Sequence, residues 1–435
     1  MADVLVEPIR NPFQVAITPP GSKSLTNRAL VLAALSEGES ELSNVLFAND
    51  TLVMIDGIAK LGFVLDLERE RNTVRVHGRG GKIEASEAEL FCANSGTTIR
   101  FLTAMCTLGH GTYQLDGTER MRQRPIGQLV DLLKNLGARI EYATNEGTPP
   151  VRVTGDGLPG GLARYGAAAS SQFLSAAVMV TPYARNEVRI DLDGPQTSWP
   201  YVAMTMQLMD HFGVTPELIR DPRSGEPKQI IIPRGTYRGT EYAIEPDASN
   251  ASYFLAAAAV HPGSKVTIDG LGKRSLQGDV GFADLLHRMG AGLVFGKDFI
   301  TITGAEKLEG IDVDLSNMPD MAQTLAAVAL FADGPTTLRG LHTLRVKETD
   351  RITALKTEIE KLGAEASASE DTLTILPPED GDFRPAMIDT YDDHRMAMSF
   401  AIVGSKVSGI TIRDAKCVQK TYPQFFEDFA RLNSA

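Results

Sequence analysis

The sequence is poor in cysteine, histidine and tryptophan, with 3, 7 and 1 of them among 435 residues. The cysteines, Cys92, Cys106 and Cys417, are odd in number and have no CxxC spacing. This pattern argues against both a disulfide framework and a structural zinc site. It predicts a reducing compartment, and we expect a cytoplasmic protein.

Long apolar runs are also missing. Nowhere do about 18 consecutive apolar residues occur, and the start, MADVLVEPIRNPF, lacks a basic segment followed by an apolar one. We therefore expect neither a membrane span nor a secretory signal. A formal net charge of −12 argues against a general basic surface for nucleic acid, so any anion must be bound locally.

What is present is an ordinary globular composition, 43% hydrophobic and 23% charged. Because domains cluster at roughly 100–200 residues, the chain is too long for one core. One pattern recurs six times: a polar turn, an apolar helix, an alternating strand, a second helix and a glycine. The polar turns follow one another at intervals of 72 to 77 residues and lie near Ser22, Asn94, Ser170, Asp247, Asp320 and Asp393.

The ends of the helices support this repeat. The first five second helices end at a glycine, which can take the left-handed cap: Gly62, Gly137, Gly213, Gly290 and Gly363. The sixth, 425–432, ends the chain. First helices such as 251–260 and 325–331 are apolar almost all round, which predicts helices inside and sheets outside. A break around 239–247 divides the repeats into two domains of three.

Several helix starts are suited to binding anions, because unpaired backbone N–H groups are exposed there. In 19–28, Gly21 permits close approach, Ser24 can cap, and Lys23 and Arg28 add charge. This segment predicts a phosphate or carboxylate cradle, or simply a capped helix. The segment 94–100 has the same design.

Three further segments allow a functional and a structural interpretation. Three arginines in 120–124 suggest a bidentate anion clamp, or charges on a surface loop. Ser170, Ser171 and Gln172 suit hydrogen bonding to a phosphate or polyol, or capping. Lys347 and Arg351 would share a helix face, with Glu348 as a nearby acid or base, unless the segment is a salt-bridge ladder.

The last two segments are less specific. Asp392, Asp393 and His394 resemble metal ligands, but the chain has no HxxxH or HExxH pair and Arg395 is adjacent. Capping and ion pairing explain that cluster better, so no metal is expected. Lys420, before the last helix, is by itself only a surface lysine.

Together, seven ordered segments resemble the family of 5-enolpyruvylshikimate-3-phosphate synthases, also called 3-phosphoshikimate 1-carboxyvinyltransferases: PGSKSLTNRAL, NSGTTIRF, DGTERMRQRPI, SSQFLSA, RVKETDRI, DDHRMAM and CVQKTYPQFF. The resemblance spans nearly the whole chain. It implies an α/β fold of two inside-out α/β barrels, each of three βαβαββ-type units. The expected domains are 22–243 and 1–21 plus 244–435, with the active site in the cleft between them.

The resemblance also implies an activity. In this family the enolpyruvyl group of phosphoenolpyruvate passes to the 5-hydroxyl of shikimate 3-phosphate and phosphate leaves, in the shikimate pathway toward chorismate and aromatic amino acids. No metal or cofactor is implied. The expected partners are these two small molecules, without nucleic acid or membrane, and the expected state is a monomer.

The family's site residues map onto this chain position by position. The residues implied for phosphoenolpyruvate are Lys23, Gly96, Arg124, Gln172, Arg351, Arg395 and Lys420. Those implied for shikimate 3-phosphate are Ser24, Arg28, Ser170, Ser171, Gln172, Ser198, Tyr201, Asp320, Thr343 and Lys347. The catalytic candidates are Lys23, Asp320, Glu348 and Lys420.

Two proton transfers are needed. Asp320 is the candidate base for the attacking hydroxyl, and Glu348 would exchange a proton with the methylene carbon. Lys23 could take either role if its pKa were lowered. We also expect the domains to stay apart until the substrates neutralise the gathered cations.

The sequence departs from a common bacterial pattern at Thr98, Phe101, Trp199 and Thr343. Gly96, which leaves room for the inhibitor glyphosate in this family, is kept, so glyphosate sensitivity is expected, although Phe101 could shift Gly96. One alternative is a UDP-N-acetylglucosamine enolpyruvyl transferase, but its usual loop cysteine is missing from 116–124. A catalytically silent binding protein is the other, and it would have lost Lys23, Asp320, Glu348 or Lys420.

Overall fold

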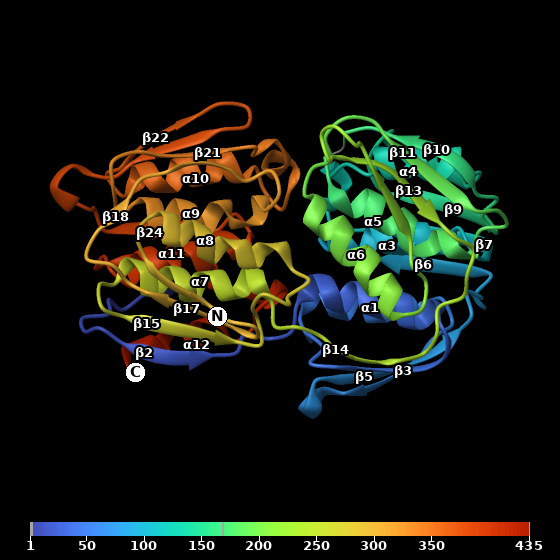
Figure 1. The fold of residues 1–435 in the computed structure, drawn as a ribbon, viewed down its shortest axis with the longest axis horizontal. Coiled ribbons are helices and arrows are strands. Elements are labelled where there is room, and N and C mark those ends of the chain that lie inside the picture. The colour runs from blue at the N-terminus through green and yellow to red at the C-terminus, as the bar shows by residue number, and fades with distance from the viewer. Residues whose placement is uncertain (1–2, 168, 435) are drawn as a thin grey trace. The chain divides into compact units, whose positions relative to one another are not determined.

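The computed structural model describes residues 3–167 and 169–434. The chain forms two compact units, here called the first unit (Gly21–Ile244) and the second unit (Met1–Pro20 with Glu245–Ala435). In each unit helices lie between peripheral sheets (Figure 1). No helix within the described residues is long and apolar enough to cross a membrane.

The first unit contains three repeats. Their first helices are α1 (Lys23–Leu35), α3 (Gly96–Cys106) and α5 (Ser171–Val180), and their second helices are α2 (Asn49–Lys60), α4 (Gly127–Asn135) and α6 (Trp199–His211). One sheet orders β14 (Glu241–Ala243), β3 (Glu37–Ser43), β5 (Thr73–Arg79) and β4 (Val64–Glu68). The next orders β6 (Glu87–Phe91), β7 (His110–Asp116), β9 (Val151–Asp156) and β8 (Arg139–Tyr142). The third orders β10 (Gly161–Tyr165), β11 (Val188–Leu192), β13 (Pro227–Ile232) and β12 (Glu217–Arg220).

The second unit repeats this plan. Its first helices are α7 (Ala248–Val260), α9 (Ala322–Ala329) and α11 (His394–Gly404), followed by α8 (Phe282–Arg288), α10 (Arg351–Lys361) and α12 (Phe425–Ala430). One sheet orders β16 (Gly292–Phe295), β17 (Phe299–Thr303), β15 (Lys265–Asp269) and β2 (Gln14–Ile17). Another orders β19 (Asp312–Asp314), β21 (Thr336–Arg339), β23 (Leu373–Leu376) and β22 (Glu365–Ala368). A third orders β1 (Val4–Leu5), β25 (Ile410–Ile412) and β24 (Ala386–Ile388), and β18 (Leu308–Glu309) pairs with β20 (Ala332–Asp333).

The strand pairing matches the predicted repeat. In the β6–β7–β9–β8 sheet, β6 and β7 are parallel and joined through α3, whereas β7, β9 and β8 are antiparallel. A parallel pair requires a crossover, which the buried helix supplies, and an antiparallel pair does not. Each four-stranded sheet has this combination, so the expected mixed α/β fold is confirmed.

Two strands, β2 and β14, lie in a different unit from the first helix that follows each of them in sequence, α1 and α7. β2, which precedes the first repeat, pairs in parallel with β15 in the second unit. β14, which follows the third repeat, pairs in parallel with β3 in the first unit. The chain consequently passes between the units twice, and the second unit is built from both ends of the sequence.

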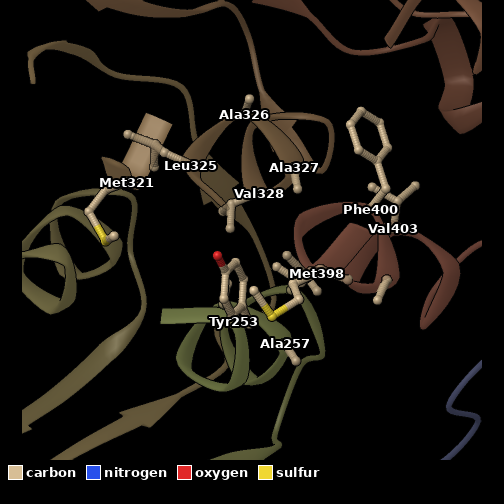
Figure 2. Close-up of a cluster of buried hydrophobic side chains, with 14 of the residues drawn as sticks. Tyr253, Ala257, Met321, Leu325, Ala326, Ala327, Val328, Met398, Phe400 and Val403 are labelled. Atoms are coloured by element: carbon tan, nitrogen blue, oxygen red, sulfur yellow. The ribbon is translucent and has the colours of Figure 1, made fainter. Parts of the chain in front are cut away.

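The first helices are buried on every side, as their composition predicts. Every residue of α3, α7 and α11 is buried. In the second unit Tyr253 and Ala257 of α7 lie near Val328 of α9 and Met398 of α11 (Figure 2). Small alanine side chains let the helices approach closely, because packed interiors leave little space between backbones.

Helix ends agree with the predicted pattern except at three starts. Gly62, Gly137, Gly213, Gly290 and Gly363 all have the left-handed φ of a C-terminal cap. Ser22, rather than Ser24, caps α1, and Ser95, rather than Asn94, caps α3. Asp320 lies in a 3-10 turn, and α9 begins at Ala322. The last α-helix ends at Ala430, and a 3-10 turn follows it directly.

Candidate active site

In the first unit the starts of α1, α2 and α3 meet around an ion pair. The Lys23 ammonium lies 3.5 Å from Asp50, a buried residue in the first turn of α2. The backbone carbonyl of Asp50 accepts hydrogen bonds from the hydroxyls of Ser95 (3.4 Å) and Thr98 (3.2 Å). Lys23 is thereby fixed to the two helix starts that follow it in the chain.

Gly96 opens the start of α3 to three polar side chains. A Cβ atom there would lie 2.8 Å from Arg124 Nη2, 2.9 Å from Arg100 Nη1 and 3.2 Å from Gln172 Oε1. Contacts this short leave no space for a methyl group unless a neighbour moves. Glycine thus allows two guanidinium groups to approach a helix N-terminus, an arrangement suited to a carboxylate or phosphate.

Arg100 is a site residue that the sequence did not identify. Its guanidinium donates to Gln172 and to the Pro125 carbonyl (2.9 Å), and it lies 4.9 Å from the centre of the Phe173 ring. The available signal was spacing: Arg100 follows Gly96 by four residues, so both occupy one face of α3. Asp50 was missed for a different reason, since only the fold brings it to Lys23.

The three arginines of the predicted clamp have different surroundings. Arg122 is exposed and pairs with Asp116 (2.5 Å), and Arg120 is half-buried and donates to Gln123. Arg124 alone is buried, and it donates to the backbone and side-chain oxygens of Asn94 at 3.1 Å. The 3-10 turn from Met121 to Gln123 explains why Arg120, Arg122 and Arg124 differ in burial although they are close in sequence.

Arg28 lies in the interior of the first unit. It is fully buried and donates to Thr205 (2.7 Å), Ser24 O (3.0 Å) and Ser175 (3.3 Å). Burial lowers its pKa to about 10. No carboxylate among the described residues pairs with Arg28, and its charge faces the rings of Phe101 (5.2 Å) and Tyr201 (6.0 Å).

The remaining predicted residues of the first unit are at the starts of α5 and α6. The Ser170 hydroxyl accepts from the Gln172 N–H (3.3 Å) and caps α5, whose first residue is Ser171. Ser198 has a left-handed backbone (φ 55°) just before α6, and the Tyr201 carbonyl accepts from Thr205. These side chains surround helix starts, as expected.

In the second unit three cations converge on Asp320. Its carboxylate accepts from Arg351 (3.0 Å) and Arg395 (3.0 Å), and the Lys347 ammonium is 3.4 Å away. These residues come from the 3-10 turn before α9 and from the starts of α10 and α11. Lys347 and Arg351 do not share a helix face, because α10 begins only at Arg351, capped by Asp350. Both nevertheless contact the same Asp320 oxygen.

Arg351 joins this group to two more carboxylates. It is 1% exposed and donates to Asp393 (2.7 Å) and Glu348 (2.9 Å). Burial acts to lower its pKa, but the nearby carboxylates of Asp393, Glu348 and Asp320 outweigh burial and raise it. Glu348 lies 3.8 Å from the Lys420 ammonium, so Lys420 is part of the cluster and not a surface lysine.

Asp393 has the capping and pairing roles that the sequence suggests. It accepts from the Arg395 N–H (2.9 Å) at the start of α11, and Arg395 also donates to the Tyr253 hydroxyl (3.4 Å). Thr343 is buried in the 3-10 turn before Lys347, and its hydroxyl has no hydrogen-bond partner among the described residues. Nor does the described part of the chain contain a group of three side chains able to hold a metal ion.

Carboxylates balance part of the expected excess of cations. Lys23 has Asp50, and the four cations Lys347, Arg351, Arg395 and Lys420 contact the three carboxylates Asp320, Glu348 and Asp393. Self-repulsion is therefore weaker than the sequence suggests.

Comparisons with known proteins agree over the full length. A family model described as EPSP synthase (3-phosphoshikimate 1-carboxyvinyltransferase) matches residues 8–429. Proteins named 3-phosphoshikimate 1-carboxyvinyltransferase from Sulfurovum sp. and Vibrio vulnificus are 44% and 43% identical, covering 100% of this chain and 100% and 99% of theirs. The structure of EPSP synthase from Acinetobacter baumannii superposes with a TM-score of 0.81 at 26% identity, covering 99% of this chain and 98% of that one. The enolpyruvyl transferase NikO from Streptomyces tendae, at 19% identity and a TM-score of 0.77, shares the fold.

Proposed function

The chain belongs to the EPSP synthase family, the 3-phosphoshikimate 1-carboxyvinyltransferases, and from this premise we propose how its two clusters divide the work. The protein is a transferase of the shikimate pathway that moves the enolpyruvyl group of phosphoenolpyruvate to the 5-hydroxyl of shikimate 3-phosphate and releases phosphate. The UDP-N-acetylglucosamine alternative is not favoured. The observation that carries the proposal is the convergence of Arg351, Arg395 and Lys347 on Asp320.

Phosphoenolpyruvate binding is assigned to the cations beside Gly96 and Asp320. Lys23, Gly96, Arg124 and Gln172 supply the contacts from the first unit, and Arg351, Arg395 and Lys420 those from the second. The support is chemical, because each guanidinium presents paired donors that match a carboxylate or phosphate. Arg100 joins this set because it lines the same opening at Gly96.

Shikimate 3-phosphate binding is assigned to hydroxyls and to the remaining charged groups. The proposed contacts are Ser24, Ser170, Ser171, Gln172, Ser198, Tyr201, Asp320, Thr343 and Lys347. Arg28 has a different part in the proposal. Its guanidinium donates to Thr205, Ser24 and Ser175, so we propose that Arg28 holds α1 and α6 in position without touching the substrate.

In the proposed mechanism, Asp320 removes the proton of the 5-hydroxyl while the oxygen of that hydroxyl attacks C2 of the enol phosphate. Glu348, held by Arg351 and close to Lys420, gives a proton to the C3 methylene carbon to form the tetrahedral adduct. Loss of that proton and departure of phosphate then restore the double bond. Lys23 and Lys420 neutralise the leaving phosphate. The protein is proposed to act as a cytoplasmic monomer on these two small molecules.

Kinetics of Asp320→Asn tests the assignment of the base. Removing a positioned base is expected to lower turnover about 10²- to 10⁴-fold, while calorimetry still detects shikimate 3-phosphate binding. Asp312→Asn is the control, because Asp312 forms an exposed pair with Arg339 (2.7 Å) in the same unit. Near-normal turnover of Asp320→Asn would remove this residue from the mechanism.

A further inference from the structure

The turn before α11 has an unfavourable backbone conformation. Tyr391 and Asp392 both have a left-handed φ, 55° and 54°, although neither is glycine. Such a conformation persists only where surrounding contacts hold it, and it is concentrated near functional sites. The next residues are Asp393, which pairs with Arg351, and Arg395, which contacts Asp320.

One buried carboxylate holds both ends of this turn. Glu358 on α10 is fully buried. It accepts a hydrogen bond from the Tyr391 hydroxyl (2.6 Å) and another from the Asp389 backbone N–H (3.1 Å). The Lys361 ammonium supplies its counter-charge at 2.7 Å. The turn is thus fixed to α10 through its side chain and its backbone.

Asp389 adds a second attachment. Its carboxylate pairs with Lys361 (2.7 Å) and with the Arg413 guanidinium. The hydrogen bond from Lys361 lowers the pKa of Asp389. Burial acts to lower the pKa of Lys361, but its hydrogen bonds to Asp389 and Glu358 raise it overall. Both groups stay charged near neutral pH, so the attachment is maintained.

The position of Glu358 on α10 connects this attachment to the site. Arg351 and Glu358 are seven residues apart, so they lie on one face of the helix. Arg351 holds Asp393 from one end of that face, and Glu358 holds Tyr391 and Asp389 from the other. Helix α10 therefore sets the position of the turn relative to the Arg351 guanidinium.

We infer that Glu358 and Tyr391 are positioning residues for the transferase reaction. Their hydrogen bond maintains the left-handed turn and so directs Arg395 and Asp393 toward the phosphoenolpyruvate contacts. Neither residue touches substrate in this account. The inference rests on the proposed function of Arg351 and Arg395.

Tyr391→Phe is the cleanest test because it removes one hydroxyl. The Tyr391 ring is 40% exposed, so the change leaves no internal cavity. We expect the KM for phosphoenolpyruvate to rise about tenfold, which corresponds to about 1.4 kcal/mol of lost binding free energy, because Arg395 and Asp393 lose part of the support that positions them. The KM for shikimate 3-phosphate should change far less, and the melting temperature should stay close to that of the wild type.

Glu358→Gln provides a second variant, and Glu360→Gln on the same helix is its control. Glu360 is exposed and, among the described residues, pairs with Lys356 one turn earlier, so its variant should behave like the wild type. Unchanged phosphoenolpyruvate KM in both Tyr391→Phe and Glu358→Gln would overturn the inference while leaving the proposed function intact. Equal rises in both KM values with a lower melting temperature would also overturn it, because they indicate a general structural role. An inactive wild-type protein would instead overturn the proposed function.

Discussion

Gly96 has no side chain at the point where three polar side chains approach the start of α3. We predict that Gly96→Ala raises the KM for phosphoenolpyruvate, because a Cβ would lie 2.8 Å from Arg124 Nη2 and 2.9 Å from Arg100 Nη1. Both groups would have to shift away from the proposed anion position. Steady-state kinetics with phosphoenolpyruvate as the varied substrate measures the effect.

Inhibition by glyphosate gives the matching readout for the same variant. The wild type should be inhibited in the millimolar range or below, and Gly96→Ala less so. Phe101 is fully buried, and its ring lies 5.2 Å from the Arg28 guanidinium. Full activity of the wild type in millimolar glyphosate would contradict this prediction.

Arg28 is a buried charge that pairs with no carboxylate in the part of the chain that the structure describes. Burial lowers the pKa of Arg28 in the folded protein to about 10, so the buried charge disfavours folding at every pH below 10, and this penalty is relieved as pH rises above 10. We predict that Arg28→Met leaves the free energy of unfolding unchanged or higher at pH 7, since replacing a buried charge by an apolar group is often neutral or stabilising. Urea unfolding measures it.

The Arg28→Met variant should be less active than the wild type even though its stability is unchanged or higher. Without Arg28 the start of α1 and the first turn of α6 lose their shared donor, so the KM for shikimate 3-phosphate should rise. A variant that unfolds more easily yet keeps the wild-type KM would show that Arg28 serves stability and not the site.

Single residues also show where sequence reasoning ends. Lys23, Arg124, Arg351 and Arg395 were identified by sequence because charge beside a polar helix start is visible in the chain. Two of their partners were not, since Asp50 is distant in sequence from Lys23 and no local pattern connects Tyr253 with Arg395. Which of Arg120, Arg122 and Arg124 is buried could not be read from composition, because the 3-10 turn from Met121 to Gln123 decides it.

At the scale of elements, the helix starts organise the site. We predict that Ser95→Ala lowers the free energy of unfolding by about 1 kcal/mol, the usual loss for an N-terminal cap. Ser95 accepts from the Thr98 N–H and also contacts the Asp50 carbonyl and the Thr98 hydroxyl (2.8 Å). Because Gly96 follows directly, the KM for phosphoenolpyruvate should rise as well.

The control for Ser95→Ala is Ser36→Ala. Ser175→Ala on α5 is not suitable, because the Ser175 hydroxyl contacts Arg28. Ser36 is buried at the end of α1, where it donates to the Leu32 carbonyl (2.8 Å). Its loss should cost stability without changing either KM. Equal kinetic effects in the two serine variants would contradict the role given to the start of α3.

Repeated elements were the part of the fold most open to prediction. Helix-ending glycines such as Gly62 and Gly363 are local signals, because a left-handed cap favours glycine wherever it occurs. The pairing of β2 and β14 is not local. Both strands match the alternating pattern of any repeat, and only long-range pairing decides that β2 joins β15 and β14 joins β3.

At the scale of the whole molecule, neither unit alone holds the full set of proposed contacts. The Gly96 cluster belongs to the first unit, and the Asp320 cluster belongs to the second. Both substrates are therefore expected to be needed together, since each cluster provides part of the charge that the reaction requires. Closure of the units on binding stays a prediction.

The most direct measurement is phosphate release by the purified wild-type protein, without added metal, from phosphoenolpyruvate alone, shikimate 3-phosphate alone, and both. The account predicts rapid release only with both, accompanied by the enolpyruvyl product. Release from either compound alone, or none with both present, would contradict it.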